Sequence, residues 1–457
     1  LTTMSLFQIT DNHDWKDCRS FFIDDNCSDD DIQNLRKIAD VKIKDLSFED
    51  NPNLLIFPCD LNCHGDKISE SNIISMNNRD EISTSNIMGF IGINETQIDI
   101  KSRFAKDDGA DYFLHYMLQK VFAINLFDIK HSSNKENIFD FLVYLFPYFL
   151  KKALAQGVFK KYQKNEYNDA RVRGSIDFNR HIKYNIPFSG NVAYNVKEHS
   201  HDNELTQLIR HTIELIKTKK HLSFILSNDL ETKECVAQIN MATPSYNMRE
   251  RNFIINNNLR LIHHPYYSAY TALQKICLQI LRHETIKFGK EKDKVYGVLF
   301  DGAWLWEEFL FTILKDYGFK HPKNKDVSGG FRMFRDAKSN DDIDDNYRRL
   351  YPDFYKDDFV IDAKYKHLES GVGREDLYQL VTYMYCIKAS NGAYIYPCKD
   401  KNIKSMKHEL SGHGGNIFIV PFLIPQSSEN YNCFRNNILK SENNLSTCDF
   451  LSSESKH

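Results

Sequence analysis

The chain has 457 residues, of which 42% are hydrophobic and 26% are charged. This length allows two or three domains, each with its own core, and the composition is that of an ordinary soluble globular protein. The formal charge of -3 gives no overall basic character, so a nucleic-acid surface has to be a local basic patch or be supplied by a partner.

The sequence also bears on location. No apolar run approaches the roughly 20 residues of a membrane span, and the 10 cysteines follow no regular disulfide framework. No charged and apolar leader opens the sequence. We therefore expect a cytoplasmic protein with reduced thiols and no membrane contact.

Residues 1–86 are rich in Asp, Asn and Ser, and we predict a polar N-terminal segment without chemistry. The acidic run at 29–31 most simply caps the helix that the apolar residues after it suggest. An acidic metal-binding loop is the alternative. The stretch from about 64 to 86 is polar and indicates a linker or a surface insertion.

Residues 87–265 form a predicted region of mixed α+β structure. Alternation from Met88 to Ile100 predicts two strands joined by a turn around Asn94 and Glu95. Strongly apolar stretches at 112–127 and 138–154 predict core helices.

The later part of this region contains a predicted strand near Tyr194, followed by a capped helix that runs to Ile216. His199 and His201 lie between them. They are not at the spacing of metal ligands on a helix, so we assign no chemistry to this stretch.

Residues 266–425 form a predicted α/β domain, in which helices surround a short central sheet. Its expected elements are a helix at 273–286, a strand at 296–300, a helix at 304–317, a hairpin at 351–366, a helix at 375–388, and strands at 392–397 and 417–424. Residues 426–457 are polar and are expected to form a loosely ordered tail.

The stretch Tyr351–Lys366 predicts a β-hairpin with a two-residue turn at 357–358. This turn sets Asp353 directly across from Asp362, where cross-strand side chains lie about 5 Å apart. Two carboxylates at that distance repel each other, and a hard divalent cation with oxygen ligands would compensate them. Lys364 lies on the same face as Asp362, while the alternate residues point toward a core.

Phosphodiester hydrolysis needs these residue types. Mg²⁺ held by Asp353, Asp362 and the Ala363 carbonyl would neutralise the phosphate and lower the pKa of a bound water. Lys364 would orient or deprotonate that water and stabilise the developing negative charge. On this pattern alone, a solvated acidic and basic turn without chemistry is the alternative.

Two flanking helices carry further candidates. Glu307 and Glu308 lie on an otherwise apolar helix, where one of them could be a further metal ligand; we expect Glu308 to face solvent. Downstream, Gln379 and Tyr383 lie at positions i and i+4 on one helix face, where they could touch a phosphate or hold the lysine. A buried amide with satisfied hydrogen bonds would give the same pattern.

The order Glu, Pro-Asp, Asp-x-Lys and Gln-x-x-x-Tyr resembles the RecB-like branch of the PD-(D/E)xK nucleases. The wider chain resembles the McrC family, the nuclease subunits of modified-cytosine restriction systems. The resemblance spans roughly residues 87–397. It is carried by Gly89–Ile100, Arg173–Phe178, Glu198–Leu205, Leu305–Glu307, Asp362–Lys366, Asp376–Gln379 and Ile395–Pro397.

The resemblance implies a C-terminal restriction-endonuclease-like domain that cleaves double-stranded DNA with Mg²⁺. It implies an active site of Glu307, Asp353, Asp362, Lys364 and Gln379, in which Glu307, Asp353 and Asp362 bind the metal. The N-terminal region, 87–265, would dock an McrB-like AAA+ GTPase and stimulate it. The sequence has no Gly-x-x-x-x-Gly-Lys-Ser/Thr loop, so GTP hydrolysis would belong to the partner.

Two features depart from the family pattern. Lys101-Ser-Arg103 stands where the family commonly has Pro-Lys after the first hairpin, and residues 1–86 match the family poorly. Two alternatives to a partner-recruited endonuclease therefore stay open. One is an activator of the GTPase that does not cut DNA, and the other is a RecB-like nuclease that acts alone.

Overall fold

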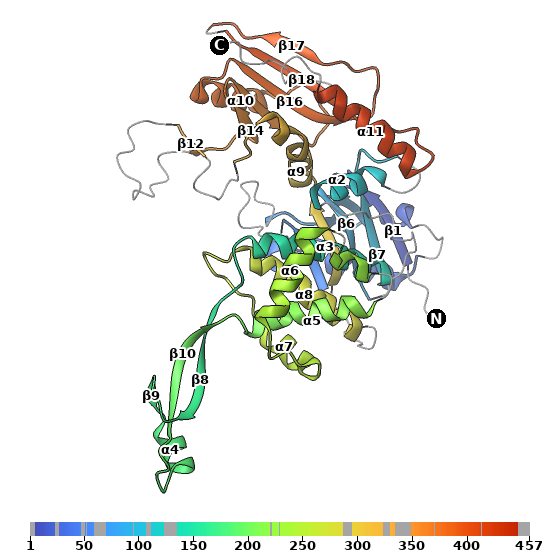
Figure 1. The fold of residues 1–457 in the computed structure, drawn as a ribbon. Coiled ribbons are helices and arrows are strands. Elements are labelled where there is room, and N and C mark those ends of the chain that lie inside the picture. The colour runs from blue at the N-terminus through green and yellow to red at the C-terminus, as the bar shows by residue number, and fades with distance from the viewer. Residues whose placement is uncertain are drawn as a thin grey trace. The chain divides into compact units, whose positions relative to one another are not determined.

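The structure is a computed structural model that describes residues 5–22, 27–46, 51, 53–58, 70–94, 96–106, 111–122, 135–219, 222–227, 229–286, 295–322, 330–333, 349–369, 371–412 and 414–446. The chain divides into two compact units (Figure 1). The first comprises Leu1–Asn125 and Lys292–His457, and the second is Leu126–Glu291. The second unit is thus an insertion in the chain of the first.

The first unit contains a five-stranded sheet in the order β1-β7-β6-β11-β3. Its strands are β1 (Ser5–Thr10), β3 (Asn53–Phe57), β6 (Ile87–Ile93), β7 (Thr96–Lys101) and β11 (Val295–Asp301). β11 follows the insertion, yet it is parallel to β3 and antiparallel to β6. Because strands from both sides of the insertion share one sheet, the boundaries predicted near 86 and 265 do not coincide with this division.

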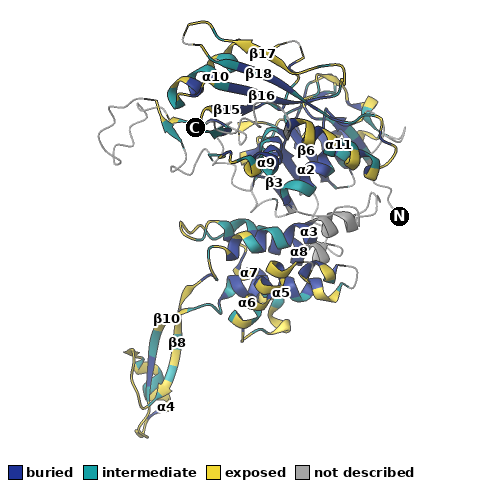
Figure 2. Cartoon of the chain, turned by 45° about the horizontal axis from the view of Figure 1, so that its top comes forward, coloured by how far each residue is buried: buried dark blue, intermediate teal, exposed yellow. Residues whose placement is uncertain are grey.

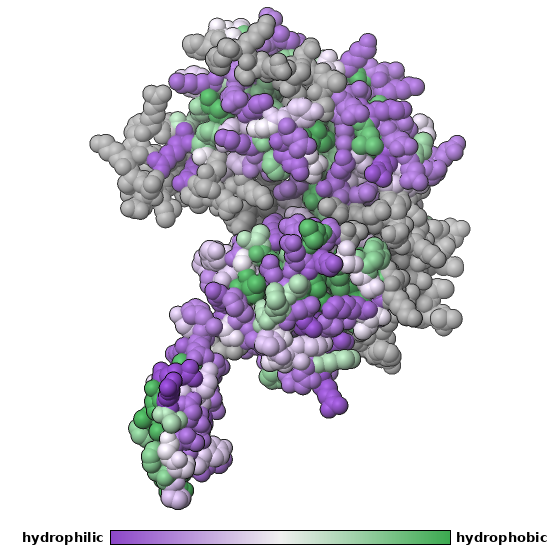
Figure 3. Space-filling view, viewed as in Figure 1, coloured by the Kyte–Doolittle hydropathy of each residue, from purple (hydrophilic) through white to green (hydrophobic). Residues whose placement is uncertain are grey.

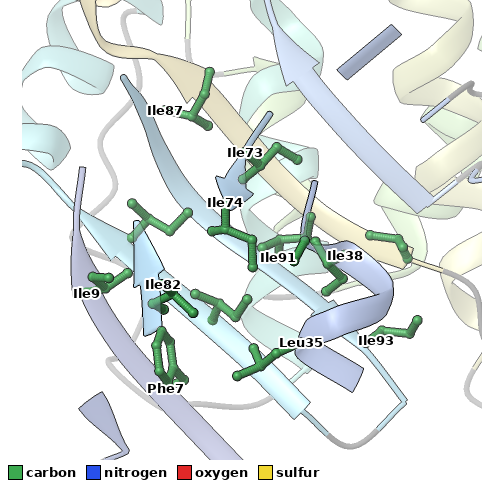
Figure 4. Packing of buried hydrophobic residues seen from close by; sticks show 14 of the residues in the cluster. Phe7, Ile9, Leu35, Ile38, Ile73, Ile74, Ile82, Ile87, Ile91 and Ile93 are labelled. Carbon is green, nitrogen blue, oxygen red and sulfur yellow. The ribbon is translucent and has the colours of Figure 1, made fainter. Parts of the chain in front are cut away.

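Residues 1–86 contribute a core rather than a polar segment. α1 (Asp29–Ile38) and the short strands β4 (Ile74–Met76) and β5 (Glu81–Thr84) pack with the sheet around one apolar cluster (Figure 4). The exposed strand β2 (Lys16–Asp17) pairs with β5. The stretch predicted as a linker supplies Ile74 and Ile82, both fully buried. Only alternate residues of a half-buried strand need to be apolar, which explains the polar composition.

The acidic run does cap α1, as predicted. The Ser28 hydroxyl accepts a hydrogen bond from the Asp31 amide at 3.2 Å, and the Asp31 carboxylate accepts one from the Ser28 amide at 3.0 Å. This reciprocal pair is a capping box. The predicted turn between β6 and β7 is also present, with Asn94 in the left-handed region at φ 50°.

The second sheet of this unit has the order β14-β15-β16-β18-β17. Its strands are β14 (Phe354–Lys356), β15 (Phe359–Ala363), β16 (Asn391–Cys398), β17 (Met406–Glu409) and β18 (Asn416–Leu423). β15, β16 and β18 are parallel, and the edge strands β14 and β17 are antiparallel to their neighbours. Figure 2 shows the central strands buried.

Helices pack on both faces of this sheet. α10 (Arg374–Ile387) packs against β15 and β16. α9 (Gly302–Leu314) also packs against β15 and brings Trp306 onto Phe422 of β18. The predicted hairpin, both helices, β16 and β18 are confirmed. A two-stranded pair, β12 (Phe331–Arg332) with β13 (Arg349–Leu350), precedes the hairpin.

The described part of the C-terminal tail is a helix, so the prediction of a loosely ordered tail is wrong there. α11 (Tyr431–Ser446) packs on β18 and on α2 (Tyr112–Phe122). Its buried apolar side chains in the described residues are Tyr431, Phe434, Ile438 and Leu445. They recur at helical spacing among polar residues, so the overall composition conceals an amphipathic helix. Residues 447–457 lie outside the described residues.

Replacing Phe434 with alanine should therefore destabilise the first unit. Phe434 is 3% exposed and stacks with Tyr431, and removing a buried phenyl ring typically costs about 3–5 kcal/mol. Denaturant unfolding measures the loss, with Asn436→Ala, an exposed position of the same helix, as the control. A loss as small as that of the control would show that α11 does not belong to the folded core.

The second unit is a helical bundle with a projecting arm (Figure 1). The bundle consists of α3 (Lys135–Leu154), α5 (Glu204–Thr218), α6 (Leu230–Ala242), α7 (Arg251–Asn257) and α8 (Ala269–Ile286). These include the core helix predicted at 138–154, the capped helix to Ile216 and the helix at 273–286. Of the helices in the described ranges, none is both long and apolar enough to cross a membrane.

The arm is a long antiparallel hairpin of β8 (Lys161–Asp169) and β10 (Val192–Ser200). Its far end carries β9 (Ser175–Ile176) and the short helix α4 (Phe178–Tyr184). The predicted strand near Tyr194 is thus part of a structure that extends away from the bundle (Figure 1).

Candidate active site

The predicted hairpin is present with its predicted register. The turn consists of Asp357 and Asp358, and Asp357 takes the left-handed φ of 39°. The pairing of β14 with β15, continued by one residue, sets Asp353 across from Asp362. The Ala363 amide donates a hydrogen bond to Asp353 Oδ2 at 2.7 Å. The main chain of one arm therefore fixes the carboxylate of the other.

β15 is buried on both faces, which the sequence did not predict. Phe359 and Ile361 point to the core, as expected, but Asp362 is also only 1% exposed. The reason is α10, whose Leu380 and Met384 share an apolar cluster with Val360 of β15. The acidic face of the hairpin thus lies beside a helix rather than in open solvent.

This burial changes the acidity of the two carboxyl groups. Burial, and then the neighbouring Asp362 carboxylate, raises the pKa of Asp353 well above its usual value. Burial also raises the pKa of Asp362, although the Lys364 ammonium opposes the shift. The two groups lie within hydrogen-bonding reach of each other. Without a metal, the pair therefore retains a proton at a pH where isolated aspartates are ionised.

The positive charge of Lys364 offsets the negative charge of the Asp353 and Asp362 pair. Its Nζ lies 2.8 Å from Asp362 Oδ2 and 3.4 Å from Asp376 Oδ1. Burial alone would lower the pKa of Lys364, but Asp362, Asp353 and Asp376 outweigh that effect and raise it. Lys364 is therefore an ammonium that stabilises negative charge. In this state it does not fit the predicted alternative role of a base.

Gln379 and Tyr383 extend the network along α10. Lys364 Nζ donates to Gln379 Oε1 at 3.4 Å, and Gln379 Nε2 donates to the Tyr383 hydroxyl at 2.8 Å. Gln379 is exposed, so the alternative of a buried structural amide is wrong. Burial raises the pKa of Tyr383 to about 12, so the side chain stays a neutral phenol beside the lysine.

Asp376 is a site residue that the sequence analysis missed. It contacts Lys364, and its Oδ2 also lies 2.5 Å from Lys366 Nζ. Burial opposes ionisation, but the two lysines outweigh it and lower the pKa of Asp376. The signal was present in the sequence, because Asp376 precedes Gln379 by three residues and so shares its helix face.

The structure does not gather all the predicted ligands. Glu307 is half-buried on α9, which packs against β15. Across the described parts of the chain, no group of three or more His, Cys, Asp or Glu side chains is arranged to hold a metal ion. Asp353 and Asp362 come together, and Glu307 does not join them in such a group.

The known protein family that matches the chain is the "McrBC 5-methylcytosine restriction system component", over residues 82–397. The chain belongs to this McrBC family. The matched range covers more than half of the sequence and contains Glu307, Asp353, Asp362, Lys364 and Gln379. No curated protein matches the sequence of this McrBC chain.

The structure also matches two solved structures. One is a half-complex of Thermococcus gammatolerans McrB AAA+ hexamers with bound McrC, with 16% identity, a TM-score of 0.45, and coverage of 96% of this chain and 100% of the matched chain. The other is the Thermococcus gammatolerans McrBC complex, with 14% identity, a TM-score of 0.33, and coverage of 69% and 89%. Membership of the McrBC family rests on the sequence match.

Proposed function

We propose that this chain is the DNA-cleaving subunit of an McrBC-type restriction system, with a PD-(D/E)xK nuclease centre in its second sheet. It hydrolyses phosphodiester bonds of double-stranded DNA with Mg²⁺, and an McrB-like AAA+ GTPase recruits it and is stimulated by it. The observation that carries the proposal is the pair of half-buried Asp353 and buried Asp362, with the Lys364 ammonium 2.8 Å from Asp362. Two carboxylates and a lysine on one hairpin are the groups that metal-assisted phosphodiester hydrolysis requires.

The residues of the pair fit a divalent cation. Burial raises the pKa of both carboxyl groups, and the neighbouring Asp362 carboxylate raises that of Asp353 further. Asp362 Oδ2 is buried and accepts no well-formed hydrogen bond from the described residues; the Lys364 ammonium is at ion-pair distance but outside hydrogen-bond geometry. Carboxylate oxygens are the ligands that Mg²⁺ prefers. Asp353 and Asp362 would hold the ion, and Glu307 remains a proposed third ligand because α9 packs against β15.

The roles of the side chains follow from their charges. Bound Mg²⁺ would supply Lewis-acid stabilisation of the phosphate and a more acidic water. Lys364, as an ammonium, would stabilise the charge that develops on the phosphate oxygens. Gln379 accepts a hydrogen bond from Lys364 and donates one to Tyr383, which keeps the lysine aimed at the pair. Losing a proton from the Asp353 and Asp362 pair is a requirement for binding the ion.

Reconstitution tests the proposal. The chain and its partner, with GTP and Mg²⁺, should convert plasmid DNA to linear fragments, and EDTA should abolish cleavage. No cleavage of either methylated or unmethylated DNA by an assembled pair that hydrolyses GTP would overturn it.

We further propose that the arm of the second unit contacts the GTPase partner. α4 has no buried residue along its fully described length. Polar contacts hold it instead: Arg180 donates to the Asn195 side chain at 3.1 Å and to the Tyr167 carbonyl at 3.0 Å. With α4 attached by polar groups, its apolar side chains face outward.

Apolar side chains gather on the solvent-exposed surface at the end of the arm (Figure 3). They are Ile176, Phe178, Ile182, Tyr184, Ile186 and Phe188, exposed by 43 to 70%. A contiguous apolar surface of this kind marks a protein interface, and it lies in the region that the family resemblance assigns to the partner.

Substituting this surface should separate partner binding from folding. Phe178→Ser with Phe188→Ser should reduce complex formation and GTPase stimulation by about 30-fold or more, since buried aromatic anchors at interfaces are worth at least about 2 kcal/mol. The thermal midpoint should stay within about 1 °C, because both rings are exposed. Met241→Ser, an exposed position on α6 of the same unit, is the control. Wild-type stimulation by the double variant would exclude the arm from the interface.

A further inference from the structure

The residue after the catalytic lysine, Tyr365, is held by the first sheet. Its side chain is 5% exposed and points away from the acidic face. Its hydroxyl is hydrogen-bonded to Ser102 Oγ at 2.7 Å and donates to Met88 Sδ at 3.1 Å. The Arg103 guanidinium lies 4.9 Å from the centre of its ring. Tyr365 thus meets β6 and the loop after β7.

The start of α9 closes the remaining side of this ring. A Cβ at Gly302 would lie 2.7 Å from Tyr365 Cε1, closer than real contacts allow, so the chain approaches the ring there as only glycine permits. Phe104 packs edge-on against the same ring at a centroid distance of 5.2 Å. The ring has little room to move without displacing main chain.

The loop that holds Tyr365 is itself fixed by buried acids. The Ser102 amide donates to Asp111 Oδ2 at 2.6 Å, and the Arg103 amide, Nε and Nη2 donate to Asp11 at 2.5, 2.9 and 2.6 Å. Asp11 and Asp111 are both buried. Charge-assisted hydrogen bonds of this number give the loop one geometry.

The main chain at Lys364 is therefore fixed on both sides, by β16 and by the first sheet. Its amide donates to the Ile395 carbonyl of β16 at 3.0 Å, and the next residue, Tyr365, is held by the first sheet. We propose that the contacts of Ser102 and Arg103 with Tyr365 form a brace. Through this brace the first sheet positions the Lys364 ammonium at Asp362. The three residues of the brace are positioning residues, since none of them contacts the acidic pair. The inference rests on the proposed nuclease function and adds to it a part of the chain that carries no catalytic group.

Removing single hydroxyl groups tests the brace. Tyr365→Phe and Ser102→Ala each delete one side of the same hydrogen bond, and each should lower kcat for DNA cleavage by about 10-fold with KM unchanged, because small displacements of a catalytic group are costly. The double variant should be no slower than the slower single variant, since both changes remove one shared interaction. Tyr431→Phe is the control, because Tyr431 is equally buried and its hydroxyl bonds Gln119 at 2.6 Å, away from the site.

A second readout separates the brace from the nuclease function. Hydrogen exchange of the full chain should be faster in the peptide 359–366 for Tyr365→Phe and unchanged there for Tyr431→Phe. If the wild type does not cut DNA but this exchange difference is found, the nuclease function fails and the brace stands. Wild-type exchange and kcat in Tyr365→Phe, or an equal loss of kcat in Tyr431→Phe, would overturn the brace.

Discussion

Replacing Lys364 with alanine is expected to slow DNA cleavage by at least about 10²–10³-fold, the usual cost of removing one preorganised group that stabilises transition-state charge. The Lys364 ammonium lies 2.8 Å from Asp362, and its raised pKa keeps it charged. Cleavage of plasmid DNA under single-turnover conditions with the partner, GTP and Mg²⁺ measures the loss. Asp362→Asn should give a loss of similar size, because it removes a proposed metal ligand.

The controls for this result separate chemistry from folding. Lys407→Ala removes an exposed lysine from β17 of the same sheet and should cut DNA within about 2-fold of wild type. Stimulation of the partner GTPase should be unchanged in all three variants, since the arm is intact. Cleavage at the wild-type rate by both Lys364→Ala and Asp362→Asn would exclude this hairpin as the nuclease centre.

Replacing Asp353 with asparagine is expected to stabilise the metal-free protein, and more so at high pH. The folded-state pKa of Asp353 is raised above that of the unfolded chain. Above about pH 4 the unfolded state therefore binds fewer protons than the folded state, and stability falls as pH rises toward the folded pKa. Asparagine has no such charge to bury, so the variant should escape this loss.

Thermal unfolding in EDTA measures the effect. Asp353→Asn should unfold a few degrees, roughly 2–5 °C, above wild type at pH 8, and the difference should shrink toward pH 5, given about 2–4 °C per kcal/mol for domains of about 150–250 residues. Mg²⁺ should raise the midpoint of the wild type and leave that of Asp353→Asn unchanged. Asp357→Asn, in the exposed turn, is the control. A difference that is the same at pH 5 and pH 8 would contradict a shifted pKa.

Local features of the site were predictable from the sequence. The register of the hairpin depends on a two-residue turn, so Asp353 and Asp362 could be placed opposite each other without any long-range information. The alternation of β15 then put Lys364 on the same face as Asp362. Gln379 and Tyr383 followed in the same way from helical periodicity.

Long-range pairing was not predictable in this way. The strand predicted at 296–300 was placed in the C-terminal domain by the boundary near 265, yet β11 pairs with β6 and β3 of the first sheet. Sequence order does not say which sheet a short apolar strand joins. The second unit, Leu126–Glu291, is inserted between strands of that sheet. Composition alone therefore placed the boundaries near 86 and 265, away from the ends of this unit.

The charge states of the site residues could not be predicted from the sequence either. Lys364 was predicted to orient or deprotonate water, and only its contacts with Asp362 and Asp376 show an ammonium held by carboxylates. Asp376 lies on a helix that comes near the hairpin through long-range packing, in which Leu380 and Met384 join Val360 of β15. The pKa of a group depends on its neighbours in the fold, and a single sequence does not show which residues these are.

The most direct test of the account is cleavage of one plasmid, methylated and unmethylated, by the chain with its partner, GTP and Mg²⁺, compared with the same reaction lacking the partner and with Asp362→Asn. Cutting is expected only in the complete wild-type mixture. Cutting by the chain alone would indicate an independent nuclease. GTPase stimulation without any cutting would indicate an activator and contradict the central claim.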